Sequence, residues 1–145
     1  MTDGDPGLRA RRPEAATLIL VGSEEDQALV VQVRREPGYV LVTVAGEIDY
    51  ASVAGLRERL FALADDGRPL IADLDQVSFI DAAGLGVLAA TARRAAAHGA
   101  TLRVVCARSR IRWLFGLTGL DRAVPVAERL AEALPDPSGA KAAAV

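Results

Sequence analysis

The sequence predicts an α/β fold: one mixed, mostly parallel β-sheet packed with about four helices. Two β-branched runs near the N-terminus are separated by a Pro-Gly turn, which is typical of an antiparallel hairpin. After the hairpin, short apolar runs alternate with segments of helical periodicity, and this order requires parallel strands joined by right-handed crossovers. The 145-residue chain is 51% hydrophobic and 4% aromatic, so we expect a single domain with an aliphatic core.

The first elements are those of the hairpin. Residues 28–33 and 39–44 are the two β-branched runs, and the Glu-Pro-Gly turn at 36–38 joins them. An apolar run at 17–21 precedes the hairpin. It fits either a short strand or a docked tail, and the sequence leaves both interpretations open.

A first helix is predicted over 53–63, where apolar residues recur every three or four positions. Asp49 or Ser52 is the expected N-cap, because both side chains can accept hydrogen bonds from free backbone N–H groups. The Asp-Gly pair at 66–67 ends this helix. A short apolar strand is predicted next, over 70–74.

A second helix is predicted to begin at Asp81, and the His-Gly pair at 98–99 closes it. The strand that follows, 102–106, is apolar apart from Arg103, so both of its faces should be buried. A third helix is predicted over 109–117, and the Thr-Gly pair at 118–119 stops it.

The last elements are an edge-like strand over 123–126, which the proline there suits, and a final helix that begins at 126 or 127 and ends at 134. Residues 1–16 are polar with Gly and Pro, so we expect a disordered N-terminal tail. Residues 135–145 are expected to form a flexible C-terminal tail, which leaves 17–134 as the domain.

Charge and cysteine content limit the possible partners. A net charge of −2 and a pI of about 5.4 give no support to nucleic-acid or membrane-surface binding. No apolar stretch approaches the roughly 20 residues that span a bilayer, and the N-terminus lacks a signal peptide. Cys106 is the only cysteine, which favours a reducing compartment. Arginine and alanine dominate over lysine as in GC-rich bacteria, so we expect a bacterial, cytoplasmic protein.

Groups for catalysis and metal binding are scarce. One histidine, His98, and one cysteine cannot form a zinc site of ordinary composition. No serine stands in a G-x-S-x-G motif. Carboxylates near strand ends could hold Mg²⁺ or accept a phosphoryl group, but a lysine for the phosphoryl charge is missing, and capping or turn formation is favoured. These carboxylates are Asp49, Asp73, Asp75 and Asp81. We therefore expect no enzyme, no metal and no cofactor.

Two further patterns allow functional alternatives. Residues 84–89 match G-x-G-x-x-A, the dinucleotide fingerprint, but they lie in a later βα unit and Asp81 would repel a pyrophosphate. Close approach of helix and sheet is the favoured explanation of the glycines. Arginines gather at 108–112 and could face solvent or an acidic protein partner. Trp113 is expected to be half-buried on the third helix, where core packing is favoured over a role as a binding anchor.

Three segments resemble the signatures of the STAS domain, which occurs in anti-sigma factor antagonists and sulphate-transporter tails. These segments are Gly46-Glu47-Ile48-Asp49 after an apolar strand, residues 73–81 with 84–88, and residues 109–121. They come in the family's order and spacing, and the resemblance covers roughly residues 28–134. It implies a STAS-like fold that binds a protein and performs no chemistry.

The resemblance also implies a partner and a switch. Such antagonists bind a kinase-like anti-sigma factor, an ATPase, and so free a sigma factor. The kinase phosphorylates them in an Asp-Ser-Ser-Gly turn, which weakens binding. Here that turn reads Asp81-Ala82-Ala83-Gly84, and Ala83 stands at the phosphoacceptor position, so no phosphorylation is expected there. The partner-binding residues implied are Asp49, Ser52, Ser78, Asp81, Ala82, Ala83, Gly84 and Leu85.

Other functions stay open at the sequence level. The same fold could serve a stress-signalling or transporter complex unrelated to a sigma factor. A small nucleotide-binding domain or enzyme that uses residues 84–89 is a third hypothesis. The sequence also leaves open whether the protein is a monomer or a homodimer.

Overall fold

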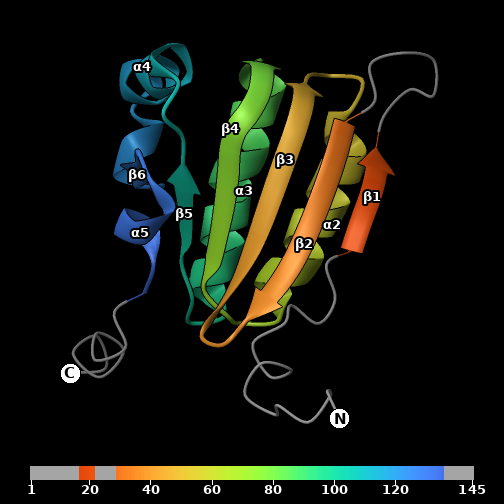
Figure 1. The fold of residues 1–145 in the computed structure, drawn as a ribbon, viewed down its shortest axis with the longest axis vertical. Coiled ribbons are helices and arrows are strands. Elements are labelled where there is room, and N and C mark those ends of the chain that lie inside the picture. Colours follow the sequence, from red (N-terminus) through yellow and green to blue (C-terminus); the bar gives the residue numbers. More distant parts are fainter. Residues whose placement is uncertain (1–16, 22–28, 136–145) are drawn as a thin grey trace, which may run out of the picture.

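A six-stranded mixed sheet carries the fold in the computed structural model, which describes residues 17–21 and 29–135. The strands lie in chain order across the sheet (Figure 1). The elements are β1 (Thr17–Val21), β2 (Leu29–Glu36), β3 (Tyr39–Ile48), α2 (Val53–Asp65), β4 (Leu70–Ile80), α3 (Ala82–Ala97), β5 (Leu102–Val105), α4 (Ser109–Thr118), the 3₁₀ helix η2 (Leu120–Arg122), β6 (Val126–Ala127) and α5 (Leu130–Ala133). The predicted α/β class is confirmed.

The hairpin of β2 and β3 is confirmed, and its turn explains why glycine is needed there. Strand β2 pairs antiparallel with β3 from Val30 opposite Ala45 to Glu36 opposite Tyr39. Gly38 in the turn has a φ of +93°, a region that side chains strongly disfavour. Strand β1 pairs antiparallel with β2, so the run at 17–21 is a strand. The predicted tails at 1–16 and 136–145, together with Ala28, lie outside the described residues.

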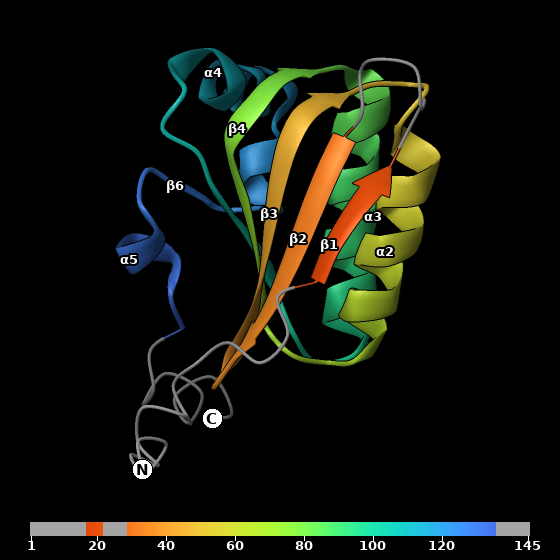
Figure 2. The same cartoon turned by 45° about the vertical axis from the view of Figure 1, so that its right-hand side comes forward.

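Two helices cover one face of the sheet. Figure 2 shows α2 and α3 on one side and α5 on the other. Inward-facing residues of the strands alternate with half-exposed ones, as in Leu29, Val31 and Val33 of β2, and they pack against α2 and α3. On the opposite face, a smaller cluster joins Leu41 and Ile71 to α5. The main core is therefore aliphatic and lies between the sheet and the helix pair.

Several predicted boundaries need correction. Strands β2 and β3 run to Glu36 and Ile48, beyond the predicted 33 and 44. Strand β4 runs to Ile80, well beyond the predicted 70–74, because β3 pairs with it in parallel along its whole length through two register shifts. The last strand is 126–127, not 123–126, because the chain first turns through η2. The last helix is the single turn α5, which leaves Arg129 before it in extended backbone.

Parallel pairing places the site. Strands β3 and β4 both end at the same edge of the sheet, so the loop into α2 and the start of α3 lie next to each other there (Figure 1). Helix α4 lies at this same end of the molecule. Among the described residues, none of the helices has the length and apolar character to cross a membrane.

Candidate partner-binding surface

Asp81 is the junction between β4 and α3. Its backbone is extended, and its Oδ1 atom accepts a hydrogen bond from Gly84 N at 3.1 Å, which caps the helix as predicted. Its other oxygen, Oδ2, accepts from Tyr50 N at 3.1 Å. One carboxylate therefore fixes both the start of α3 and the loop between β3 and α2.

The start of α3 presents small uncharged side chains to solvent. Ala82 is exposed and Ala83 is half-exposed, whereas Gly84 is buried. A Cβ on Gly84 would lie 2.7 Å from Ile48 Cγ2 and 2.7 Å from Ile80 Cγ1, so only glycine lets the helix approach the sheet this closely. Leu85 is partly buried and packs against the core. The surface of this turn therefore consists mainly of the two alanines.

The loop between β3 and α2 is held by its own polar groups. Asp49 Oδ1 accepts from the backbone N–H groups of Ala51 and Ser52, both at 3.0 Å. Ser52 Oγ donates to Glu47 O at 2.9 Å, and the residue is only 3% exposed. Ser52, one of the partner-binding residues that the resemblance implies, is therefore buried and stabilises the loop. The side chain that this loop exposes to solvent is Tyr50, which is 84% exposed.

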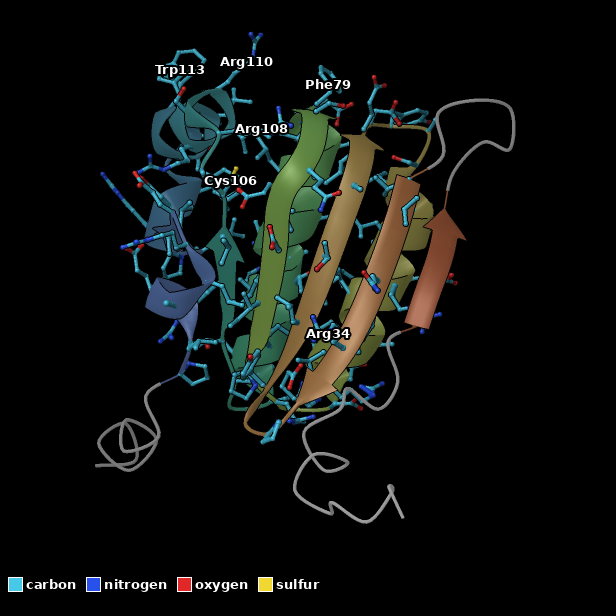
Figure 3. The ribbon with its side chains drawn as sticks, viewed as in Figure 1. Arg34, Phe79, Cys106, Arg108, Arg110 and Trp113 are labelled. Carbon is cyan, nitrogen blue, oxygen red and sulfur yellow. The ribbon has the colours of Figure 1, made fainter. Side chains whose placement is uncertain are left out.

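A groove lies between the end of β4 and helix α4. Its volume is about 510 Å³, and it is lined by Ser78, Phe79, Ile80, Asp81, Arg110, Ile111, Trp113 and Leu114. Ser78 is exposed and makes one long hydrogen bond, from Oγ to Gly46 O at 3.4 Å. Phe79 is 47% exposed. Figure 3 shows Phe79, Arg110 and Trp113 projecting at the same end of the molecule.

Trp113 corrects one prediction. It is 60% exposed rather than half-buried in the core. Ile111 and Phe115, four residues apart, form the buried stripe of α4. Trp113 lies midway between them, about half a helical turn away, and so points outward. Tyr50 and Phe79 were not among the predicted site residues, although Tyr50 directly follows one STAS-like motif and Phe79 lies within another, in a chain with six aromatic residues.

The remaining carboxylates act locally on the backbone. Asp73 Oδ1 accepts from Asp75 N at 3.0 Å, and Asp75 Oδ1 accepts from Ala107 N at 2.6 Å. Burial raises the pKa of the Asp73 carboxyl. Within residues 17–21 and 29–135, His, Cys, Asp and Glu form no group of three that could hold a metal ion. The predicted role in caps and turns is confirmed for Asp49 and Asp81, whereas Asp73 and Asp75 lie within strand β4.

Other chemistry is poorly supported at this end of the fold. Burial raises the pKa of the Cys106 thiol, which disfavours a reactive thiolate. The G-x-G-x-x-A segment begins three residues after Asp81, whose carboxylate already accepts from the N–H of Gly84. The carboxylate thus places a negative charge at the helix start, where a phosphate would have to bind. The arrangement suits contact with another protein.

Comparison with known sequences decides the family. Residues 30–133 match the STAS domain. The chain belongs to the STAS domain family. This STAS domain protein is 34% identical over 99 residues to the anti-sigma-B factor antagonist of Bacillus subtilis (strain 168), covering 68% of this chain and 91% of that protein. It is 31% identical over 101 residues to the anti-sigma-B factor antagonist of Staphylococcus aureus (strain NCTC 8325), covering 69% and 94%.

A solved structure shows the same fold. The crystal structure of an anti-sigma factor antagonist from Mycobacterium paratuberculosis superposes with a TM-score of 0.69 and 29% identity, covering 80% of this chain and 100% of that one. The predicted STAS-like architecture is therefore confirmed. The family of anti-sigma factor antagonists consists of non-enzymatic regulators, which confirms the prediction that this STAS domain protein is not an enzyme.

Proposed function

We propose that this STAS domain protein is an anti-sigma factor antagonist that binds a kinase-like anti-sigma factor and so frees a sigma factor for transcription. The observation that carries the proposal is the uncharged start of α3, where Ala82 is exposed and Ala83 is half-exposed, next to the loop whose exposed Tyr50 donates its backbone N–H to Asp81. The names of the relatives from Bacillus subtilis and Staphylococcus aureus support the choice of partner. No cofactor is needed for this function.

The physical basis is that the partner can bury this apolar turn without having to desolvate a charged group. Ala83 has no hydroxyl group, so an ATP-dependent kinase has nothing to modify at this position. A phosphoserine there would add close to two negative charges that have to be desolvated in the interface. Without a phosphorylatable residue at position 83, this surface can bind the partner at all times. The level of free sigma factor then follows the amount of this protein, and the proposed complex lies in the cytoplasm with the transcription machinery.

The test is an affinity measurement on the turn. Calorimetric titration with the purified kinase-like anti-sigma factor and ATP is expected to give tight binding for the wild type. Ala83→Asp should weaken it at least about tenfold, or about 1.4 kcal/mol. Ala97→Asp places the same charge on an exposed alanine at the opposite end of α3 and should leave affinity unchanged. Equal affinities for wild type and Ala83→Asp would remove the interface from this turn.

A phosphorylation assay tests the constitutive state separately. Incubation of the wild type with the kinase and ATP should leave the protein unmodified, whereas Ala83→Ser should gain one phosphate. Mass spectrometry distinguishes the two outcomes. Phosphate on the wild type at Ser78 or Ser52 would contradict constitutive activity, although the Ser52 hydroxyl is buried in its loop.

A further inference from the structure

We infer that the groove between the end of β4 and α4 is a second subsite for the same partner, which takes an apolar side chain with a carboxylate next to it. The inference rests on the proposed function and adds the chemistry of the partner. It assigns to Phe79, Trp113 and Arg110 the role of selecting which anti-sigma factor is bound.

The distribution of aromatic residues is the first argument. The chain has only six, and three of them are strongly exposed: Tyr50, Phe79 and Trp113. Phe79 and Trp113 lie at the end of the molecule where β3 and β4 terminate (Figure 3), and Tyr50 follows the last residue of β3 by two positions. Exposed aromatic clusters are uncommon on monomers and mark interaction sites, and Trp and Tyr are the residue types that carry most binding energy. Half of the few aromatic residues are therefore exposed and do not contribute to the core, which is consistent with a role in binding.

The shape of the groove fits an inserted side chain. Its lining includes Ile80 and Ile111, which are buried, and Leu114, which is half-buried. Phe79 and Trp113 stand at its rim. A volume of about 510 Å³ accepts one or two side chains and lies within the range of ordinary binding pockets. The groove thus favours a partner that inserts an apolar side chain over one that presents a flat surface.

The groove carries one charge of each sign, Arg110 and Asp81, but only the carboxylate of Asp81 has hydrogen-bond partners within the fold that the structure describes. Arg110 is exposed and forms no ion pair with any residue that the structure describes. Its neighbours are engaged: Arg112 pairs with Glu128 at 2.8 Å, and Arg108 Nε donates to Asp75 O at 2.8 Å. The carboxylate of Asp81 already accepts from two backbone N–H groups. The free positive charge therefore favours a carboxylate on the partner, which a guanidinium can hold with two hydrogen bonds.

The groove continues the surface of the proposed interface. Asp81 lines the groove and also caps α3, directly before Ala82 and Ala83. A stable protein interface covers about 800 Å² on each partner, more than one helical turn supplies. A partner that covers the two alanines therefore extends over Tyr50 on one side or over the groove on the other. Phe79 and Trp113 provide the apolar contact area on the groove side.

The single tryptophan makes a direct test possible. Trp113 is the only tryptophan in the chain, so protein labelled with 5-fluorotryptophan gives one ¹⁹F resonance, at the groove. The probe is the unlabelled kinase-like anti-sigma factor with ATP that binds the wild type. Its addition should shift or broaden that resonance. Arg110→Glu should weaken binding about tenfold and Arg110→Lys by less, because Lys keeps the charge but loses the two-pronged geometry.

A matched control and two contrary outcomes complete the experiment. Arg93→Glu makes the same charge change at an exposed position on α3 and should not alter affinity. Binding that Ala83→Asp disrupts, with an unmoved ¹⁹F resonance and no effect of Arg110→Glu, overturns this inference and leaves the proposed function intact. A shifted resonance with binding that tolerates Ala83→Asp instead keeps the groove and overturns the proposed surface on α3.

Discussion

At Gly84, close packing of α3 against the sheet leaves no room for a side chain. Its missing side chain lets α3 contact Ile48 and Ile80 directly, at distances that a Cβ could not keep. Gly84→Ala should therefore destabilise the fold by about 1–3 kcal/mol through overpacking. Chemical denaturation in urea measures this change. The cause is a steric clash and not a lower helix propensity. The variant should therefore unfold at a lower urea concentration while its native helix content stays that of the wild type.

Gly86 supplies the matched control two residues further along α3. A Cβ there meets nothing within 4 Å, and the residue is exposed inside a helix. Gly86→Ala should stabilise the protein by about 0.5–1 kcal/mol, because alanine is the better helix former. Equal effects of the two substitutions would show that helix propensity, and not contact with Ile48 and Ile80, decides the choice of glycine at 84.

Asp73 makes stability depend on pH in an unusual direction. Burial raises the pKa of its carboxyl above the ordinary value of 3.8. The native state then holds a proton that the unfolded chain has already lost, so the free energy of unfolding falls as pH rises from about 3.8 through the raised pKa. Asp73→Asn keeps an oxygen to accept from Asp75 N and removes the charge. It should be more stable than the wild type at pH 7.

The comparison at low pH separates this effect from packing. Below a pH of about 3.8 the carboxyl is neutral in both states, so the advantage of Asp73→Asn should vanish there. Urea denaturation of both proteins at pH 3 and pH 7 checks the difference. A constant gap between them at the two pH values would assign the effect of the substitution to something other than titration.

At the scale of elements, the start of α3 could be predicted from neighbouring residues, whereas the full length of β4 depends on pairing with a strand distant in sequence. Asp81 was predicted as an N-cap because its side chain precedes a periodic apolar run, and its bond to Gly84 N confirms the prediction. The polar residues Asp75, Gln76 and Ser78 hid the continuation of β4, since only pairing with β3 reveals that the strand goes on to Ile80. Trp113 was misplaced for a similar reason: apolar character alone does not say which side of a helix is buried.

The cap at the start of α3 leads to a prediction about this element. Asp81→Ala removes both hydrogen bonds of the carboxylate, to Gly84 N and to Tyr50 N. It should cost about 1–2 kcal/mol in the free energy of unfolding measured with urea. Asp81→Asn retains one oxygen for the cap and loses the acceptor for the loop, so it should cost less. If the two variants are equally unstable, the cap contributes little and the loop contact dominates.

At the scale of the whole molecule, the order of strands and helices determined the class of fold, and the motifs determined the family. The candidate site was only partly accessible to this reasoning. Ala82, Ala83 and Asp81 follow from the resemblance, because one turn contains them. The groove does not, because Phe79 and Trp113 are 34 positions apart and meet only through the parallel arrangement of β4, β5 and the helix after it.

Cys106 allows the cooperativity of this whole arrangement to be measured. Its thiol lies at the end of β5, fully buried, within 3.9 Å of the carbonyl oxygens of Leu74 and Arg108. An aromatic disulfide reagent should therefore react only with molecules that open, about 10³-fold or more slowly than with the unfolded chain for a typical domain stability. If opening is global, the logarithm of the rate should rise with urea with the slope of equilibrium unfolding. A fast reaction without urea, or a shallow slope, would mean that β5 and α4 separate locally and that the groove beside them is not rigid.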